Sequence, residues 1–153
     1  MDTRARIRKR CFSMVQTRIT SGSKYSRCRS GKREDLDNLF FRSSWEANYA
    51  RYLNWLKDLN QIKDWQYEPD TFEFFSIKKG TRFYTPDFKI MNLDDSIEYH
   101  EVKGWMDEKS FTKLKRMAKY YPEIKLVLID QYVYVPIHKE MKNLIPGWEM
   151  SIK

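Results

Sequence analysis

The sequence predicts a single α/β domain preceded by a basic segment. The chain has 153 residues, 41% of them hydrophobic and 16% aromatic, which suffices for one domain with a packed core. Patterns typical of helices and strands alternate along residues 34–153 in the order α-β-β-β-(β)-α-β. Charge is divided unevenly along the chain. Residues 1–33 carry 11 Lys and Arg and one acid, whereas residues 34–153 carry 18 Lys and Arg and 20 Asp and Glu. We therefore divide the chain into an N-terminal arm, 1–33, and a domain, 34–153.

The N-terminal arm has a net charge of +10, which predicts a polyanionic partner. Its bases are spaced by Ser, Thr and Gly, and such a cluster releases the counterions condensed on nucleic acid when it binds phosphates. Two other interpretations stay open, a solvated tail and an organellar targeting segment. If the arm binds nucleic acid, the DNA-binding residues near its end are Arg27, Arg29, Lys32 and Arg33.

The first element of the domain is an amphipathic helix that begins near Ser43. Ser43 stands three residues before Glu46, which matches a capping box. A helical stripe follows, formed by Trp45, Tyr49, Tyr52, Leu53, Leu56 and Leu59. From residue 64 onward, aromatic and β-branched segments separated by turn residues predict an antiparallel meander, with strands at 65–68, 71–77, 82–91 and 96–103.

The second half of the domain begins with a helix predicted at 107–121 and stopped by Pro122. The continuous apolar run 124–129 is typical of a strand buried on both faces. A short strand at 132–135 and a short helix at 137–144 are expected to follow. No apolar run approaches ~20 residues, so the sequence predicts no membrane span.

Two predicted strands carry the residues that point to chemistry. Glu101 and Lys103 project from the same face at the end of one strand, and Val102 points away. A hairpin would bring Asp87, on the preceding strand, beside Glu101. Two carboxylates and a main-chain carbonyl are ligands that suit Mg²⁺, and metal-assisted phosphodiester hydrolysis needs such a cation. The same short patterns recur elsewhere in the chain, so an ordinary surface ion pair stays open as the alternative.

Three segments in this order resemble the PD-(D/E)xK nuclease superfamily, and within it the phage endonuclease I family of Holliday junction resolvases. The segments are Phe41-Arg-Ser-Ser-Trp-Glu46, Tyr84-Thr-Pro-Asp-Phe88 and Glu101-Val-Lys-Gly-Trp105, and the similarity covers about residues 40–130. The resemblance implies a restriction-endonuclease-like domain with an α-β-β-β-α-β core and a mixed central sheet flanked by helices. It also implies a metal-dependent endodeoxyribonuclease that uses one or two Mg²⁺ or Mn²⁺ ions and cuts branched DNA or Holliday junctions.

The same resemblance implies roles for individual residues. Asp87 and Glu101 would hold the metal, with the Val102 carbonyl as a third ligand, and Lys103 would position the water or stabilise the transition state. Glu46 would be a further acidic ligand for a second metal. The alternative for Glu46 is a purely capping role, since a Glu folded back on its own helix N-terminus is poorly placed for a metal. A homodimer in the cytoplasm is expected, in the host cytoplasm if the chain is phage-encoded.

Further basic residues are candidates for DNA contact. Arg42 lies within the first matched segment, and three bases share one face of the second predicted helix: Lys109, Lys113 and Arg116. An ordinary solvated helix face is the other interpretation of those three. Two alternatives without catalysis also stay open for the whole chain: a nucleic-acid-binding module, and a phage structural protein with a basic arm.

Overall fold

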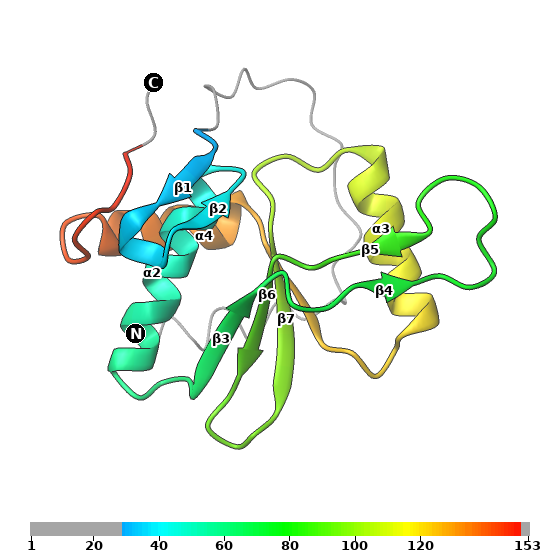
Figure 1. The fold of residues 1–153 in the computed structure, drawn as a ribbon, viewed down its shortest axis with the longest axis horizontal. Coiled ribbons are helices and arrows are strands. Elements are labelled where there is room, and N and C mark those ends of the chain that lie inside the picture. The colour runs from blue at the N-terminus through cyan, green and yellow to red at the C-terminus, as the bar shows by residue number, and fades with distance from the viewer. Residues whose placement is uncertain (1–28, 151–153) are drawn as a thin grey trace.

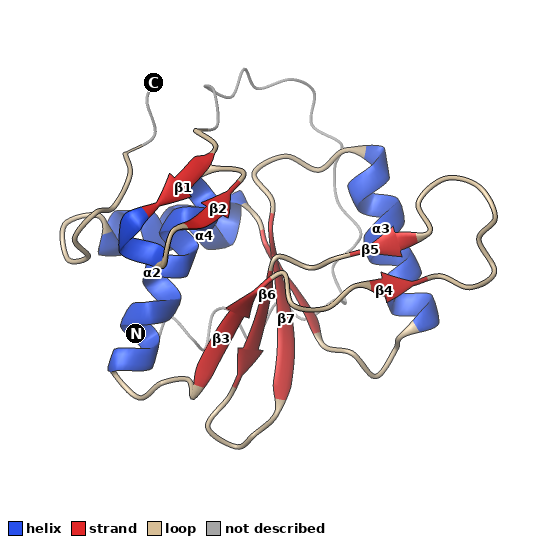
Figure 2. Ribbon diagram, viewed as in Figure 1, coloured by secondary structure: helices blue, strands red, loops and turns tan. Residues whose placement is uncertain are grey.

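A mixed four-stranded sheet forms the centre of the protein. The computed structural model describes residues 29–150. The strands of the central sheet lie in the order β3-β6-β7-β8, with the first three antiparallel and β8 parallel to β7 (Figure 2). Their bounds are Asp64–Tyr67 for β3, Phe88–Met91 for β6, Ile97–Val102 for β7 and Leu126–Ile129 for β8. The α/β class expected from the sequence is therefore confirmed.

Helices cover both faces of this sheet, so the domain has three layers (Figure 1). Helices α2 (Ser44–Asp58) and α4 (Gln131–Met141) enclose the larger core on one face. Helix α3 (Glu108–Tyr120) encloses a smaller core on the other face. Strand β7 serves both cores, because Val102 belongs to the larger one and Tyr99 to the smaller one. Odd-numbered side chains of β7 therefore face α3, as the alternation of a strand requires.

The two longer helices begin where their caps predict. The hydroxyl of Ser43 accepts a hydrogen bond from the backbone N–H of Glu46 at 3.2 Å, which fixes the start of α2. Asp107 accepts from the backbone N–H of Ser110 at 2.7 Å and caps α3 in the same way. The helical stripe of α2 is buried from Tyr49 to Leu56, as expected from its spacing.

Two small sheets flank the central one and differ from the predicted meander. The predicted strand 71–77 contributes only β4 (Phe72–Glu73), and the predicted strand 82–91 is divided into β5 (Phe83–Tyr84) and β6. Strands β4 and β5 pair with each other outside the central sheet. Pro86 stands at the break, and because proline has no backbone N–H it cannot donate to a continuing ladder.

The end of the basic arm is part of the folded domain. Gly31–Arg33 forms β1, which pairs antiparallel with β2 (Leu39–Phe41), and the short 3-10 helix η1 (Glu34–Leu36) lies between them. The rest of the arm, residues 1–28, lies outside the described residues.

The predicted strand at 132–135 is wrong, because these residues belong to helix α4. The side chain of Asp130 caps the helix by accepting from the backbone N–H groups of Tyr132 and Val133, at 3.0 and 3.1 Å. Tyr134 stacks on Trp45 of α2, with ring centroids 4.0 Å apart, and is fully buried. These contacts override the strand preference of the alternating Tyr-Val sequence. Within residues 29–150, no helix has the length and apolar character needed to cross a bilayer.

Candidate active site

A cavity of about 190 Å³ opens where the start of α2, the β5–β6 connection and the end of β7 meet. It is lined by Arg42, Glu46, Thr85, Asp87, Glu101, Val102, Lys103 and Lys113. All five residues to which the sequence assigns metal or catalytic roles are therefore brought together around one space. Four of them are titratable side chains, and they come from three separate elements of the chain.

Asp87 is the most buried acid of this cavity, with 3% of its surface exposed. Its Oδ2 accepts a hydrogen bond from the backbone N–H of Val102 at 2.8 Å, and its Oδ1 accepts from Arg42 at 3.0 Å. Burial raises the pKa of Asp87 to about 8, and the nearby carboxylates of Glu101 and Glu46 contribute to the rise. A carboxyl in this state favours any additional positive charge that enters the cavity.

Glu101 lies on the neighbouring strand, close to Asp87. The hydroxyl of Tyr84 donates a hydrogen bond to its Oε2 at 2.8 Å. Burial raises the pKa of Glu101, while the Tyr84 hydrogen bond and the charges of Lys103 and Lys113 act to lower it. Two carboxyls with raised pKa values thus share one partly desolvated space, an arrangement common at functional sites.

Glu46 both caps its helix and faces the cavity. Its Oε1 accepts from the hydroxyl of Ser43 at 3.0 Å. Its Oε2 accepts from the backbone N–H of Arg42 at 3.1 Å and from the hydroxyl of Tyr67 at 2.7 Å. The capping geometry does not take the side chain away from the other acids, since Glu46 still lines the cavity. The two interpretations of Glu46 are therefore compatible in space.

Arg42 places a guanidinium among the acids. Besides Asp87 it donates to Glu68, and its Nε lies 4.0 Å from Glu46 Oε2. Burial acts to lower the pKa of Arg42, but the three surrounding carboxylates raise it above its usual value. Among the described residues, Arg42 thus supplies the positive charge nearest to Asp87. Its side chain is 59% exposed, so it can turn toward solvent without disturbing a packed core.

The acids suit a hard cation, although they are not arranged as a finished metal centre. Within residues 29–150, no three His, Cys, Asp or Glu side chains are grouped closely enough to hold an ion as they stand. Asp87 and Glu101 nevertheless supply oxygen donors of the kind that Mg²⁺ and Mn²⁺ prefer, at a site where burial penalises their charge. The carboxylate oxygens therefore fit a divalent metal ion, and Arg42 would compete with that ion for Asp87.

Two lysines lie on the side of the cavity nearest α3. Lys103 follows β7 directly. Its backbone N–H donates a hydrogen bond to the carbonyl of Ile129 at 3.0 Å, which fixes its position. Lys113 projects from α3, and its Nζ lies 5.7 Å from the centroid of the Tyr84 ring. Lys113 was predicted only as a DNA-binding residue, yet the fold places it beside the acids. Trp105, two residues after Lys103 in the chain, is 44% exposed and so does not belong to the core.

The sequence did not single out Glu68 and Tyr67, which complete the polar surroundings of the cavity. Both lie at the end of β3, where the backbone N–H of Glu68 donates to the carbonyl of Asp87 at 2.8 Å. The only signal was indirect, because the predicted strand 65–68 ended in an acid. Which strand it would pair with was not readable from the chain.

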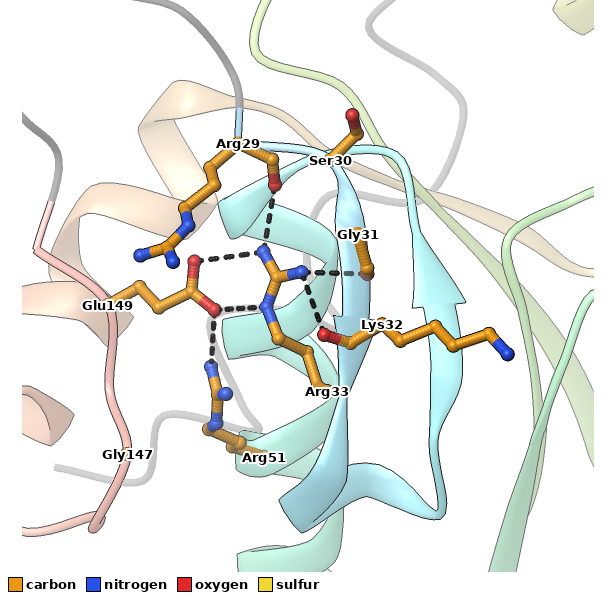
Figure 3. Close-up of a pocket in the computed structure, with 8 residues that line it drawn as sticks. All are labelled: Arg29, Ser30, Gly31, Lys32, Arg33, Arg51, Gly147 and Glu149. Carbon is orange, nitrogen blue, oxygen red and sulfur yellow. Dashed lines mark hydrogen bonds and ion pairs between the residues drawn. The ribbon is translucent and has the colours of Figure 1, made fainter.

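The basic residues from the arm lie at a different place, around a larger cavity of about 260 Å³ (Figure 3). Arg33 donates to Glu149 and, at 2.7 Å, to the carbonyl of Gly31, so its guanidinium ties β1 to the C-terminal part of the chain. Lys32 points away from Glu149, and the backbone carbonyl of Arg29 accepts a hydrogen bond from Arg33 at 2.8 Å (Figure 3). Arg27 lies outside the described residues.

The three bases of α3 that the sequence suggested for DNA contact are not equivalent. Lys109 is exposed, whereas Lys113 and Arg116 are partly buried. Arg116 donates to the backbone carbonyl of Thr81, and so joins α3 to the β4–β5 hairpin. Only Lys113 lines the acidic cavity.

The fold and the cavity together define an α/β protein with a buried acidic site flanked by lysines. The chain belongs to the DUF1064 family, described as proteins of unknown function, whose profile matches residues 23–134. The matched region includes every residue that lines the acidic cavity. Neither a curated protein nor a solved structure matches the chain.

Proposed function

We propose that this protein is a metal-dependent endodeoxyribonuclease that hydrolyses DNA phosphodiester bonds. The observation that carries the proposal is the pair of carboxyls formed by the buried Asp87 and the partly buried Glu101, which share one cavity with Lys103. Their raised pKa values, caused mainly by burial, mean that a negative charge on either carboxyl is penalised until a further cation enters the cavity. A site that must bind a divalent cation and a phosphate together needs this combination of acids and a nearby base.

The roles follow from the positions of the side chains. Asp87 and Glu101 would hold Mg²⁺ or Mn²⁺, with Glu46 available to a second ion and Val102 at the cavity wall. A divalent cation held there supplies charge that stabilises the transition state and lowers the pKa of an attacking water. Lys103 would donate to a phosphate oxygen or to the water. Arg42 would leave Asp87 when the cation binds.

The order of elements supports a restriction-endonuclease-like core. With the small β4–β5 hairpin inserted between β3 and β6, helix α2, the antiparallel strands β3, β6 and β7, helix α3 and the parallel strand β8 have the order α-β-β-β-α-β, and the sheet is mixed. This is the arrangement that the resemblance to PD-(D/E)xK nucleases implies. By the same resemblance we propose branched DNA as the substrate, a homodimer as the active form, and the cytoplasm, that of the host for a phage protein, as the location.

A second candidate is a nucleic-acid-binding protein without catalysis, and one observation favours it. Arg42 bonds Asp87 and Glu68 and lies near Glu46, so part of the acidic charge is neutralised without any metal. In that case the cavity would be a structural ion-pair cluster that stabilises the sheet edge, and the basic residues alone would carry the function. The two candidates differ in whether a divalent cation changes the protein.

The test is an incubation of supercoiled, linear and four-way-junction DNA with the protein, in Mg²⁺ or in EDTA. The proposal expects cutting in Mg²⁺ only, and its loss in Glu101→Gln and Lys103→Met. The matched controls are Glu140→Gln and Lys142→Met, which carry the same Glu-x-Lys pattern but do not line the cavity. Uncut DNA in every lane would reject the enzyme, and cutting that survives both site variants would place the chemistry elsewhere.

A further inference from the structure

The β4–β5 hairpin presents two phenylalanines to solvent. Phe75 is 74% exposed and Phe83 is 55% exposed. The hairpin extends outward beside α3, away from the larger core (Figure 1). An exposed aromatic ring leaves a large apolar surface in water, and two of them on one small element indicate a contact surface.

The base of this hairpin is held firmly against α3. Phe74 is fully buried, and its backbone N–H donates to the carbonyl of Arg82 at 2.8 Å. Tyr121, at the end of α3, donates from its hydroxyl to the carbonyl of Glu73 at 2.7 Å. Arg116 of α3 donates to the carbonyl of Thr81. Both β4 and the end of the loop before β5 are thus anchored to α3, so the exposed rings are displayed on a fixed support.

The charge of the hairpin selects the partner. The hairpin, residues 72–84, contains three bases, Lys78, Lys79 and Arg82, and one acid, Glu73, which pairs with Arg82 and leaves the two lysines in excess. The Arg82 guanidinium lies 5.4 Å from the centroid of the Phe83 ring, so charge and aromatic surface are adjacent. Bases interleaved with exposed rings suit a nucleic acid, whose phosphates and base faces are bound together. A second copy of the hairpin would bring like charges together, which disfavours self-association through this face.

The hairpin is also continuous with the acidic cavity. Strand β5 leads directly through Thr85 to Asp87, and Tyr84 within β5 donates to Glu101. DNA bound across the cavity would therefore extend onto the hairpin. Rings can stack on bases only where the bases are not already stacked inside a duplex, which is the case in single-stranded or branched regions.

We propose that the β4–β5 hairpin is a base-stacking element, in which Phe75 and Phe83 hold unpaired bases at a branch in DNA while Lys78 and Lys79 contact the adjoining phosphates. The inference rests on the proposed function in one respect, that the polyanion is DNA. It adds a site for branch recognition that is separate from the acids.

The test measures binding in EDTA, so that no cleavage is required. A splayed DNA fork carries 2-aminopurine at the branch, and its fluorescence reports the stacking of that base. We expect the wild-type protein to change this fluorescence and the Phe75→Ala/Phe83→Ala variant not to do so. Affinity of the variant for the fork should fall at least about thirtyfold, the effect of losing two stacked bases, while affinity for duplex DNA changes less than twofold.

Leu93→Ala is the matched control. Leu93 is 57% exposed in the turn between β6 and β7, and its loss should change neither the fluorescence of the fork nor the affinity for it.

A Lys78→Glu/Lys79→Glu variant should weaken fork and duplex binding alike and flatten the salt dependence. Unchanged fork fluorescence and affinity in the double Phe variant would overturn the inference. A double Phe variant that loses only self-association, measured by light scattering, would show a protein interface and overturn it too. Branch stacking by a protein that never cuts DNA would instead reject the nuclease and leave this inference intact.

Discussion

Replacing Asp87 by Asn should stabilise the metal-free protein, and more so as the pH rises. The pKa of Asp87 is raised from its usual 3.8 to about 8. Between these two values the folded protein holds a proton that the unfolded chain has already lost. The free energy of unfolding of the wild type therefore falls as pH rises through this window. Asn does not titrate, so the free energy of unfolding of the variant lacks this decrease with pH.

The size of the effect follows from the same numbers. One pH unit within the window changes the free energy of unfolding by at most about 1.4 kcal/mol for one titrating group. From pH 5 to pH 7, the advantage of Asp87→Asn over the wild type should grow by about 2–3 kcal/mol. Titrating groups outside the cavity cancel in this difference because both proteins contain them in the same surroundings. Above about pH 8 the difference should level off.

Urea unfolding in EDTA at several pH values measures this difference directly. Addition of Mg²⁺ should reverse the order, since an ion that binds only the folded wild type stabilises it by mass action. A constant difference between pH 5 and 8, or a variant that is less stable throughout, would refute the assignment of Asp87 as a carboxyl whose negative charge is penalised by burial.

Three further outcomes are expected from the polar contacts of the cavity. Arg42→Ala should strengthen Mn²⁺ binding about fivefold in calorimetry, because a half-exposed guanidinium worth about 1 kcal/mol no longer competes for Asp87; weaker binding would show that Arg42 helps the ion instead. Tyr84→Phe should lower the cleavage rate about tenfold and move the acid limb of the pH–rate profile to higher pH, because the pKa of Glu101 rises when the hydrogen bond that lowers it is removed; an unmoved profile would contradict this. Ser43→Ala should destabilise the fold by about 1 kcal/mol in urea, as for other N-caps, and a change near zero would show that the cap is redundant.

Local signals in the sequence predicted the parts of the fold that depend on neighbouring residues. The start of α2 at Ser43 and the alternation along β7 are of this kind, because a cap and a strand period are set within a few residues. The helix at 132–135 was missed because its Tyr-Val alternation resembles a strand. Its actual conformation depends on the contact between Tyr134 and Trp45, far apart in the chain.

The candidate site also has some residues that local sequence predicts and others that depend on long-range pairing. Asp87 and Glu101 were placed on adjacent strands by the hairpin expected between them, and the structure pairs β6 with β7. The partners Glu68 and Tyr67 could not be found, because they depend on β3 pairing with β6. Arg42 was expected to contact DNA, and its bond to Asp87 arises only when α2 packs on the sheet. Long-range pairing thus decides which charges meet.

The central claim, that Asp87 serves a metal-dependent nuclease, is tested most directly by one comparison. The chain holds two Pro-Asp pairs, and Asp70, in the other pair, accepts from Tyr99 at 2.6 Å and pairs with Lys89 at 2.8 Å outside the cavity. The measurement is the rate at which supercoiled DNA is nicked in Mg²⁺ by the wild type, Asp87→Asn and Asp70→Asn. We expect Asp87→Asn to lose at least about a hundredfold in rate and Asp70→Asn to cut within about twofold of the wild type. Equal rates for the two variants, or nicking that continues in EDTA, would contradict the account.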